Sequence, residues 1–418
     1  MRRYESYKDS GVEWLGEVPS HWELKRLKQL FVEKKHKQNL SLNCGAISFG
    51  KVIEKADDKV TEATKRSYQE VLKGEFLINP LNLNYDLISL RIALSEIDVV
   101  VSAGYIVLKE KQIINKKYFS YLLHRYDVAY MKLLGSGVRQ TINYGHISDS
   151  ILVIPPLSEQ QKIAQFLDDK TAKIDRAVDL AEKQIALLKE HKQILIQNAV
   201  TRGLNPDVPL KDSGVEWIGQ VPEHWDVQRS KFIFKKIERK VNEEDQIVTC
   251  FRDGQVTLRA NRRTEGFTNA LKEHGYQGIR KGDLVIHAMD AFAGAIGISD
   301  SDGKATPVYS VCLPHKKQKI DVYFYAYYLR NLALSGFISS LAKGIRERST
   351  DFRYADFAEL LLPIPPYLEQ QKIADYLDKQ TSKIDQVIAL KTAHIEKLKE
   401  YKSVLINDVV TGKVRVSV

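Results

Sequence analysis

The sequence has 418 residues, of which 44% are hydrophobic and 9% aromatic, so it is long and apolar enough for two to four globular domains and is not disordered. The 63 lysines and arginines outnumber the 53 acidic residues and give a net charge of +10, which favours an anionic partner, with nucleic acid ahead of a membrane surface. No apolar segment follows the first charged residues, no run reaches the roughly 18 apolar residues that span a bilayer, and the three cysteines lie far apart, so we expect a cytoplasmic protein without a disulfide framework or zinc site.

A framework segment near the start of the chain returns in its second half. DSGVEWLGEVPSHW begins at Asp9 and DSGVEWIGQVPEHW at Asp212, and 13 of the 20 positions that start at these residues are identical. A repeated tryptophan is more often a core anchor than a base-stacking side chain. The expected framework anchors are Trp14, Trp22, Trp217 and Trp225.

The stretch that follows each copy diverges almost completely from the other and has a mixed α/β pattern. One faint echo remains, because Lys73-Gly74-Glu75 and Lys281-Gly282-Asp283 each precede an apolar run. Amphipathic spacing predicts helices at Tyr118–Tyr130 and Val322–Leu334. Short apolar runs bounded by glycines and polar turns predict strands at Phe76–Ile78, Val99–Val101, Tyr105–Leu108, Leu284–His287 and Tyr309–Leu313.

A second framework segment closes each half. IPPLSEQQKIAQFLDDKTAKID (Ile154–Asp175) and IPPYLEQQKIADYLDKQTSKID (Ile364–Asp385) are identical at 15 of 22 positions. The two prolines halt the preceding strand and introduce a helix of about 40 residues. Ser158 and Gln161 match a capping box, which the second copy lacks because Leu368 replaces the serine.

The apolar positions of both helices recur in heptads, which predicts a continuous seam on each. Lys391 and Lys402 interrupt the second seam. A lone helix of this length would expose its seam to water, so we favour an antiparallel pair within the chain over separate packing of each helix on its own globular domain. The expected core of the pair is Leu167, Ile174, Leu188, Leu195, Leu377, Ile384, Leu398 and Leu405.

Two polar, glycine-hinged loops lie just before the second framework segments, in equivalent places, and a third basic cluster follows a predicted strand. Arginine, lysine, asparagine and glutamine suit base edges, and the same residues with serine and threonine suit phosphates. For any single residue a solvated surface position is an equal alternative. The candidate DNA-binding residues are Arg139, Gln140, Thr141, Asn143 and Tyr144 in the first loop, Lys343, Arg346 and Arg348 in the second, and Arg259, Asn261, Arg262 and Arg263 in the cluster.

The positive charge gathers on the two divergent stretches. Residues 25–150 carry 20 basic and 13 acidic residues, a net of +7, and residues 229–350 carry 21 and 13, a net of +8. The first helix, 159–202, is nearly neutral with 8 and 7. The predicted fold is α+β, with two globular α/β domains at 1–154 and 205–363 and two long helices at 155–204 and 364–418 that pair as an antiparallel coiled coil with internal pseudo-twofold symmetry.

No motif supports catalysis by this chain. A phosphate-binding G-x-x-x-x-G-K-[ST] loop is absent, and the ten histidines show no metal-ligand spacing. The run Pro363–Tyr367 imitates the Pro-Pro box of an adenine methyltransferase but has Ile364 where a polar side chain is required, so it is read as a strand-to-helix break. Gly294 to Gly297 is read as a tight turn. We therefore expect no catalytic residue, no metal site and no cofactor bound by this chain.

The order of framework segment, divergent domain and helix, given twice, resembles the specificity subunit of type I restriction–modification systems. The DSGVEW openings and the EQQKIA boxes carry this resemblance, which covers essentially the whole chain. It implies a non-catalytic DNA reader whose two target recognition domains each contact one half of a split, asymmetric double-stranded target. It also implies that the paired helices set the spacing and dock two methyltransferase subunits.

The resemblance further places the chemistry on partner subunits. Methyltransferase subunits would carry S-adenosylmethionine, and motor–nuclease subunits, where present, would use ATP and Mg. Two other classes remain as alternatives: a self-sufficient nuclease or methyltransferase, which the missing motifs oppose, and a stand-alone sequence-specific DNA-binding regulator with a coiled-coil scaffold.

Overall fold

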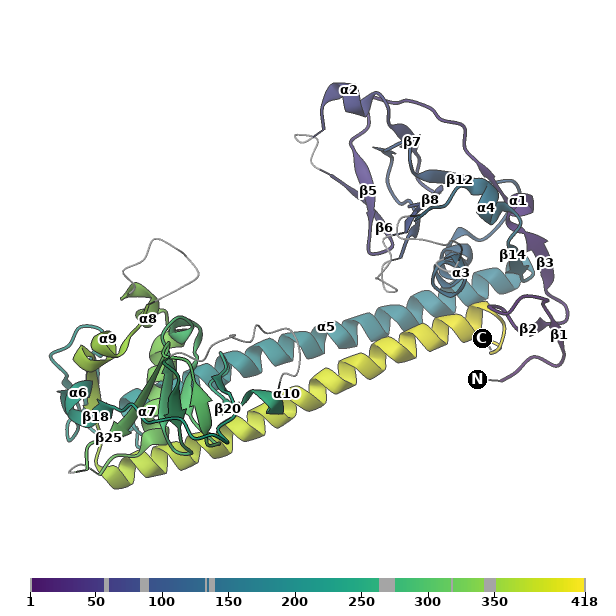
Figure 1. The fold of residues 1–418 in the computed structure, drawn as a ribbon. Helices are drawn as coiled ribbons and strands as arrows, with labels where there is room; N and C mark the ends of the chain where they lie inside the picture. Colours follow the sequence, from purple (N-terminus) through teal and green to yellow (C-terminus); the bar gives the residue numbers. More distant parts are fainter. Residues whose placement is uncertain are drawn as a thin grey trace. The chain divides into compact units, whose positions relative to one another are not determined.

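The computed structural model describes residues 2–55, 60–82, 90–131, 134, 140–262, 275–316, 319–341 and 351–416. The chain divides into two compact units, unit 1 with Met1–Ala181 and Ala393–Val418, and unit 2 with Glu182–Thr392. Each unit contains one globular domain and a portion of each of two long helices (Figure 1).

The long helices are α5 (Leu157–Arg202) and α10 (Tyr367–Val410), and they pair antiparallel. Two ion pairs show the direction. Asp175 on α5 contacts Lys402 on α10 in unit 1, and Lys192, seventeen residues further along α5, contacts Asp385, seventeen residues further back along α10, in unit 2. At ~1.5 Å per residue each helix is roughly 65–70 Å long.

The globular domain of unit 1 is made of short strands and helices. In chain order they are β1 (Tyr7–Asp9), β2 (Glu17–Pro19), β3 (Glu23–Arg26), α1 (Leu27–Leu30), β4 (Phe31–Glu33), β5 (Gly45–Ser48), β6 (Lys51–Glu54), α2 (Glu62–Lys65), β7 (Gln69–Val71), β8 (Phe76–Ile78), β9 (Leu81–Asn82), β10 (Ile92–Leu94), β11 (Val99–Val101), β12 (Ile106–Glu110), α3 (Lys116–Ala129), β13 (Gln140–Thr141), α4 (Tyr144–Ser148) and β14 (Ile151–Ile154).

The globular domain of unit 2 follows the same plan. Its elements are β15 (Leu210–Asp212), β16 (Gln220–Pro222), β17 (Asp226–Arg229), α6 (Ser230–Ile233), β18 (Phe234–Lys236), β19 (Val248–Cys250), β20 (Val256–Leu258), η3 (Arg259–Asn261), β21 (Gln277–Ile279), β22 (Leu284–His287), η4 (Ala291–Ala293), β23 (Ile296–Ile298), β24 (Gly303–Ala305), β25 (Tyr309–Pro314), α7 (Val322–Leu334), α8 (Phe337–Ser340), α9 (Tyr354–Glu359) and β26 (Leu361–Ile364).

Both domains are built on a four-stranded antiparallel sheet of the same topology. The order is β10-β8-β12-β4 in unit 1 and β23-β22-β25-β18 in unit 2. A separate ladder, β3 with β14 or β17 with β26, joins the strand after the opening framework segment to the strand before the two prolines. The framework segments that lie far apart in sequence are therefore adjacent at the start of each long helix.

Aromatic side chains fill the space between each sheet and the helix packed on it. In unit 1, Phe31 makes edge-to-face contacts with Phe76 and with Phe119 of α3, at ring-centroid distances of 5.5 and 5.6 Å. In unit 2, Phe234 contacts Tyr325 of α7 at 5.3 Å. Such pairs add roughly 0.5–1.5 kcal/mol to the apolar burial that holds a helix on a sheet.

The predicted α+β class and the antiparallel helix pair are confirmed. Strands β8, β11 and β22 and helix α7 have the expected bounds, and β12, β25 and α3 differ by one or two residues at one or both ends. The break at the two prolines is confirmed as well, since β26 ends at Ile364 and α10 begins at Tyr367. None of the helices in the described ranges is both long and apolar enough to cross a membrane.

One expectation about the helices is wrong, and another gains a contact that the sequence did not predict. Ser158 is not an N-cap, because α5 begins at Leu157, and the Pro156 carbonyl already accepts the amide of Gln160 at 3.0 Å. The interruptions of the second seam, in turn, are more than gaps: Lys402 pairs with Asp175 at 2.6 Å, and Lys391 donates to Gln184 at 2.7 Å. A heptad pattern counts lysine as a polar interruption. A lysine at the edge of the seam can nevertheless pack its aliphatic stem there and extend its ammonium group to an acceptor on the other helix.

Candidate nucleic-acid interface

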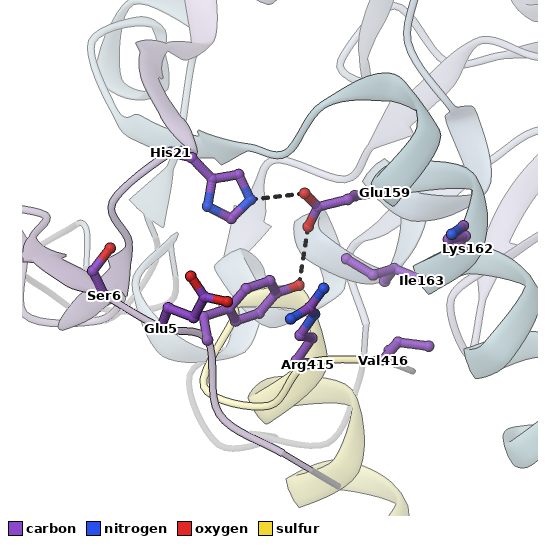
Figure 2. A pocket seen from close by; sticks show the side chains of 9 residues that line it. Glu5, Ser6, His21, Glu159, Lys162, Ile163, Arg415 and Val416 are labelled. Atoms are coloured by element: carbon purple, nitrogen blue, oxygen red, sulfur yellow. Dashed lines mark hydrogen bonds and ion pairs between the residues drawn. The ribbon is translucent and has the colours of Figure 1, made fainter. Parts of the chain in front are cut away.

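The two framework segments of unit 1 meet at Glu159, in the first turn of α5 (Figure 2). Its carboxylate lies 2.7 Å from Nε2 of His21 and accepts hydrogen bonds of 3.1 Å from the Trp22 indole and the Tyr4 hydroxyl. Burial, followed by the charge of Glu159, raises the pKa of Tyr4 above its ordinary value, so this hydroxyl remains a donor. A cavity of about 510 Å³, lined also by Arg415, opens beside this joint.

Unit 2 repeats the joint with one difference. Glu369, in the first turn of α10, lies 2.7 Å from Nε2 of His224. The neighbouring Trp225 is fully buried, but its indole nitrogen has no hydrogen-bond partner in the described part of the chain. Gly203 follows the last residue of α5 at φ 74°, a left-handed conformation that favours glycine, and a Cβ there would lie 2.8 Å from a carboxylate oxygen of Glu369.

The glutamine after each framework glutamate ties the globular domain to the start of the long helix. Gln160 donates to the carbonyl of Pro155 at 2.9 Å, and its own carbonyl accepts the amide of Asn115, the N-cap of α3, at 2.9 Å. Gln370 makes the same two bonds in unit 2, with Asp321 as the N-cap of α7. The repeated EQQ box thus has a physical role, which is to connect the domain helix with the scaffold helix.

A tyrosine six residues after the N-cap of each domain helix makes a second contact with the scaffold helix. The hydroxyl of Tyr121 donates to Asp168 of α5 at 2.7 Å, and that of Tyr327 donates to Asp378 of α10 at 2.7 Å. Burial above all, with a smaller contribution from the carboxylate, raises the pKa of both tyrosines, which keeps them protonated as donors. Together with the glutamines, these bonds fix how each domain helix sits on its portion of the helix pair.

The structure also locates the residues expected to form the helix-pair core and the framework anchors. Leu167, Ile174, Leu377 and Leu405 are buried, whereas Leu188, Leu195, Ile384 and Leu398 are partly exposed. Trp14, Trp22 and Trp225 are buried, and Trp217 is partly exposed and stacks on Phe337 at 4.3 Å.

The candidate DNA-binding residues of unit 1 lie on the segment that returns to the scaffold. Arg139 falls outside the described residues, and Gln140 is placed only as a backbone residue of β13 beside Thr141. Asn143 caps α4 through the amide of His146 at 3.1 Å. Tyr144 donates to the carbonyl of Phe31 at 2.9 Å, and Tyr354 makes the equivalent bond in unit 2, so this tyrosine has a structural role whatever else it contacts.

In unit 2 the basic cluster is partly described. Arg259 and Asn261 form the turn η3 and contact Thr249 and Thr257 at 3.3 and 2.8 Å. Arg262 pairs with Asp253 at 2.7 Å and lies 4.2 Å from the centre of the Phe251 ring. The remaining candidates, Arg263, Lys343, Arg346 and Arg348, fall outside the described residues.

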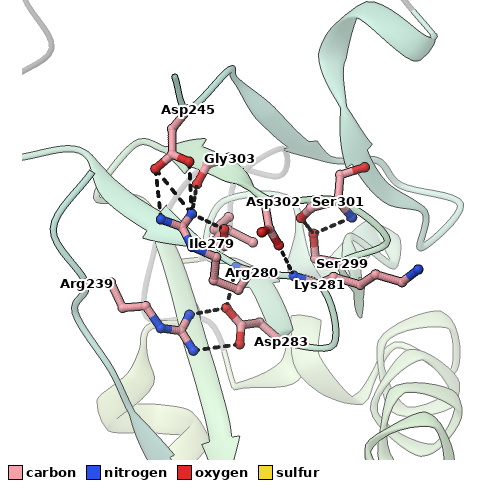
Figure 3. A network of polar contacts seen from close by, with 10 residues as sticks. All are labelled: Arg239, Asp245, Ile279, Arg280, Lys281, Asp283, Ser299, Ser301, Asp302 and Gly303. Atoms are coloured by element: carbon pink, nitrogen blue, oxygen red, sulfur yellow. Dashed lines mark hydrogen bonds and ion pairs between the residues drawn. The ribbon is translucent and has the colours of Figure 1, made fainter. Parts of the chain in front are cut away.

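Sequence reasoning missed a polar network at the turn before the central strand of each domain, and Figure 3 shows the one in unit 2. In unit 2, the Asp283 carboxylate, in the turn before β22, accepts hydrogen bonds from the Arg239 guanidinium. It also accepts one of 2.7 Å from the backbone amide of Arg280. In unit 1, Glu75 receives Lys34 at 2.8 Å and a turn amide in the same place. The sequence did contain a signal for this network, the Lys-Gly-Glu and Lys-Gly-Asp motifs that precede both strands. The carboxylate of each motif accepts a hydrogen bond from a backbone amide in the turn before the strand.

The described residues lack a clustered set of metal ligands. They contain no group of three or more histidine, cysteine or carboxylate side chains arranged to hold a metal ion. Cys44, Cys250 and Cys312 are buried and free of disulfides, and burial raises the pKa of the Cys250 and Cys312 thiols, which disfavours their nucleophilic thiolate form.

Comparisons with known proteins agree with this architecture. A family model described as "Type I restriction modification DNA specificity domain" matches residues 19–190 and again 222–400. The putative type I restriction enzyme MjaX specificity subunit of Methanocaldococcus jannaschii is 24% identical, over 96% of each chain. The EcoBI specificity subunit of Escherichia coli is 22% identical, over 65% of this chain and 60% of its own.

Two solved structures share the fold. The first is a chain from a structure that describes complex assembly and conformational transition of the type I R-M system, with a TM-score of 0.69 at 14% identity. The match covers 95% of this chain and 99% of the other. The HsdS subunit of Thermoanaerobacter tengcongensis has a TM-score of 0.54 at 15% identity, with 97% of this chain and all of its own covered. Because the family model matches two segments that together make up most of the sequence, the chain belongs to the type I restriction–modification DNA specificity family, whose members are the non-catalytic specificity subunits of these systems.

Proposed function

We propose that each globular domain reads one half of an asymmetric, bipartite double-stranded DNA target, and that the helix pair sets the distance between the half-sites and docks two methyltransferase subunits. Two motor–nuclease subunits complete the complex where they are present. S-adenosylmethionine, ATP and Mg are then bound by those partners, and the protein acts in the cytoplasm, where its DNA substrate lies.

One observation carries this proposal: the contacts that hold each domain on the scaffold are repeated, whereas the domains that they hold differ. Glu159 and Glu369 begin the long helices with the same histidine contact, and Tyr121 and Tyr327 make the same bond to an aspartate. The net charges of +7 and +8 on the two divergent stretches suit a polyanion. An asymmetric split target requires two different recognition domains, and the repeated contacts would hold both on the scaffold in the same way.

A domain exchange tests the division of labour. Residues 25–150 would be replaced by the corresponding domain of another family member, and the chain produced with its methyltransferase partner in cells. Sequencing of methylated adenines should show one half of the motif changed and the other half and the gap retained. A change in both halves would contradict the modular reading.

A paired insertion tests the spacing. A heptad added to α5 after Ala181 requires a second heptad in α10 at Glu396, which the register of the ion pairs places opposite. Seven residues add about 10 Å of helix, or about three base pairs, at ~1.5 Å per residue and ~3.4 Å per base pair. The gap in the motif should lengthen by about that amount, while a heptad in α5 alone should abolish methylation because it breaks the register.

A further inference from the structure

Both globular domains expose a large apolar side chain where the central part of the sheet ends. Leu81 stands three residues after β8 and is 54% exposed, and Met289 stands two residues after β22 and is 49% exposed. Exposed apolar side chains are common singly, but these two occupy the same place in two domains of otherwise divergent sequence. The place is therefore retained while the residue type differs.

Backbone hydrogen bonds establish that the two places are equivalent. The amide of Ile142 donates to the carbonyl of Pro80 at 3.0 Å, and the amide of Phe352 donates to the carbonyl of Ala288 at 3.1 Å. Ile142 and Phe352 belong to the segment that leads from each domain to its long helix, which is called the returning segment below. In each domain this segment is hydrogen-bonded to the residue just before the exposed side chain. The exposed side chain and the returning segment thus form one surface in each domain.

In unit 2 this surface is a groove of about 550 Å³. Met289, Ser310 and Pro307 lie along it, and Lys236 and Arg353 contribute cationic groups. Asp351 pairs with Nε of Arg353 at 2.7 Å, and Lys236 pairs with Glu238 at 2.8 Å. Arg353 is still highly exposed, and the contact with Asp351 runs through its Nε.

This combination fits the edge of a DNA double helix. The major groove presents an apolar group only at the thymine methyl, and a guanidinium edge suits guanine or a phosphate. Methionine is flexible and polarizable, and so adapts to a surface that it must contact closely. A single folded peptide or a membrane surface would not explain why the equivalent place in the other domain carries a different apolar residue on a domain of similar positive charge.

We propose that this groove is the base-reading surface of the second domain, with Met289 against a thymine methyl and Arg353 setting the neighbouring position, and that Leu81 does the same work in the first domain. The proposal rests on the proposed function, because it requires that the domains read DNA. It assigns specificity to described residues that the sequence did not mark as candidates.

The test compares Met289→Ala and Leu81→Ala in the full chain, each produced with the methyltransferase partner, by sequencing methylated adenines in host genomic DNA. Met289→Ala should relax one position of one half-site, so that preference for the cognate base falls roughly ten- to a hundredfold, and leave the other half-site unchanged. Leu81→Ala should do the same in the opposite half-site. Arg353→Gln should relax a position adjacent to the one that Met289→Ala affects.

Tyr323→Ala is the matched control, because Tyr323 is also 49% exposed in unit 2 but does not line the groove, and it should leave every position unchanged. Met289→Gln keeps the side-chain volume and serves where the alanine variant gives no methylation. Unchanged preference at every position in both Met289 variants would overturn the inference, as would a uniform loss without relaxation. If the unaltered protein gave no bipartite motif, the proposed function itself would fail, which is a separate outcome.

Discussion

Trp22 and Trp225 stand at the same place in the two framework copies, yet their indole nitrogens have different surroundings. Both side chains are fully buried. Trp22 donates to Glu159, which also receives Tyr4, whereas Trp225 has no hydrogen-bond partner in the described part of the chain. Tyr4 lies before the first repeated segment, and its ring packs 5.6 Å from that of Trp22.

The difference shows what the duplication retains and what it does not. Apolar packing of the tryptophan comes from residues inside the repeat, so it is present in both units. The hydrogen-bonded arrangement around the glutamate also depends on a residue outside the repeat: the position 203 residues after Tyr4 is Asp207, which cannot replace a tyrosine ring. Identical framework residues therefore do not guarantee equally stable joints.

Replacing each tryptophan by phenylalanine should separate the two joints most clearly. Trp22→Phe removes a hydrogen bond to a charged acceptor, for which we expect a loss of about 1.5–3 kcal/mol in the free energy of unfolding beyond the cost of repacking. Trp225→Phe loses no hydrogen bond to the described residues and removes a buried N–H that has no partner among them, so its loss should be smaller. Calorimetric unfolding of both variants measures this, and equal losses would contradict the comparison.

The domain helices offer a second contrast, because His124 of α3 occupies the place of Arg330 of α7. Burial, the largest effect, lowers the pKa of His124 below its ordinary value, so the folded protein holds this imidazole neutral. As pH falls through about 6.5, the unfolded chain takes up a proton that the folded chain does not, and the free energy of unfolding decreases. Arginine at the equivalent place in unit 2 stays charged over this range, so it adds no such dependence.

His124→Gln should make the fall in stability between pH 7.5 and 5.5 shallower, by at most about 1.4 kcal/mol per pH unit for one proton. Unfolding by urea at several pH values measures the slope. His394→Gln, which changes an exposed histidine on α10, is the control and should leave the slope as it is. A slope that is the same in all three proteins would show that His124 does not couple folding to protonation.

The sequence predicted the parts of the molecule whose cause is local or repeated. The apolar runs of β8 and β22 and the spacing of α7 need no knowledge of the rest of the chain, and the repeated boxes marked both ends of the helix pair. The ion pair of Lys402 with Asp175 could not be predicted, because its partners are 227 residues apart. The reading surface around Met289 was missed for a related reason: a lone apolar residue gains its meaning only from the returning segment that lies beside it.

The tyrosine ties should behave alike in the two units, in contrast to the tryptophans. Tyr121→Phe and Tyr327→Phe each remove one bond to a carboxylate and leave the ring in place. These hydroxyls lie nearer to solvent than the fully buried Trp22 indole, so each loss should be smaller, about 1 kcal/mol of unfolding free energy. Tyr401→Phe, on an exposed side chain of α10, should cost little. Thermal unfolding of the three variants measures these losses. A loss of stability in only one of the two tie variants would contradict the expected equivalence.

The smallest expected effect belongs to the ion pairs that cross the helix pair. Lys192 is partly exposed and Asp385 is exposed, so reversing one charge in Lys192→Asp should cost only about 0.2–1 kcal/mol, and less at high salt. Adding Asp385→Lys should restore the lost stability.

Lys402→Asp should lose a similar amount in unit 1, but the positive charge of Lys402 also lowers the pKa of His124, so its removal should raise that pKa. The pH dependence of stability should therefore change with Lys402→Asp and not with Lys192→Asp, which can be followed from the imidazole resonances of the two variants by NMR titration. If neither variant shifted the titration of His124, the lysine would act on the helix pair alone, and the two ion pairs would be equivalent in function as well as in geometry.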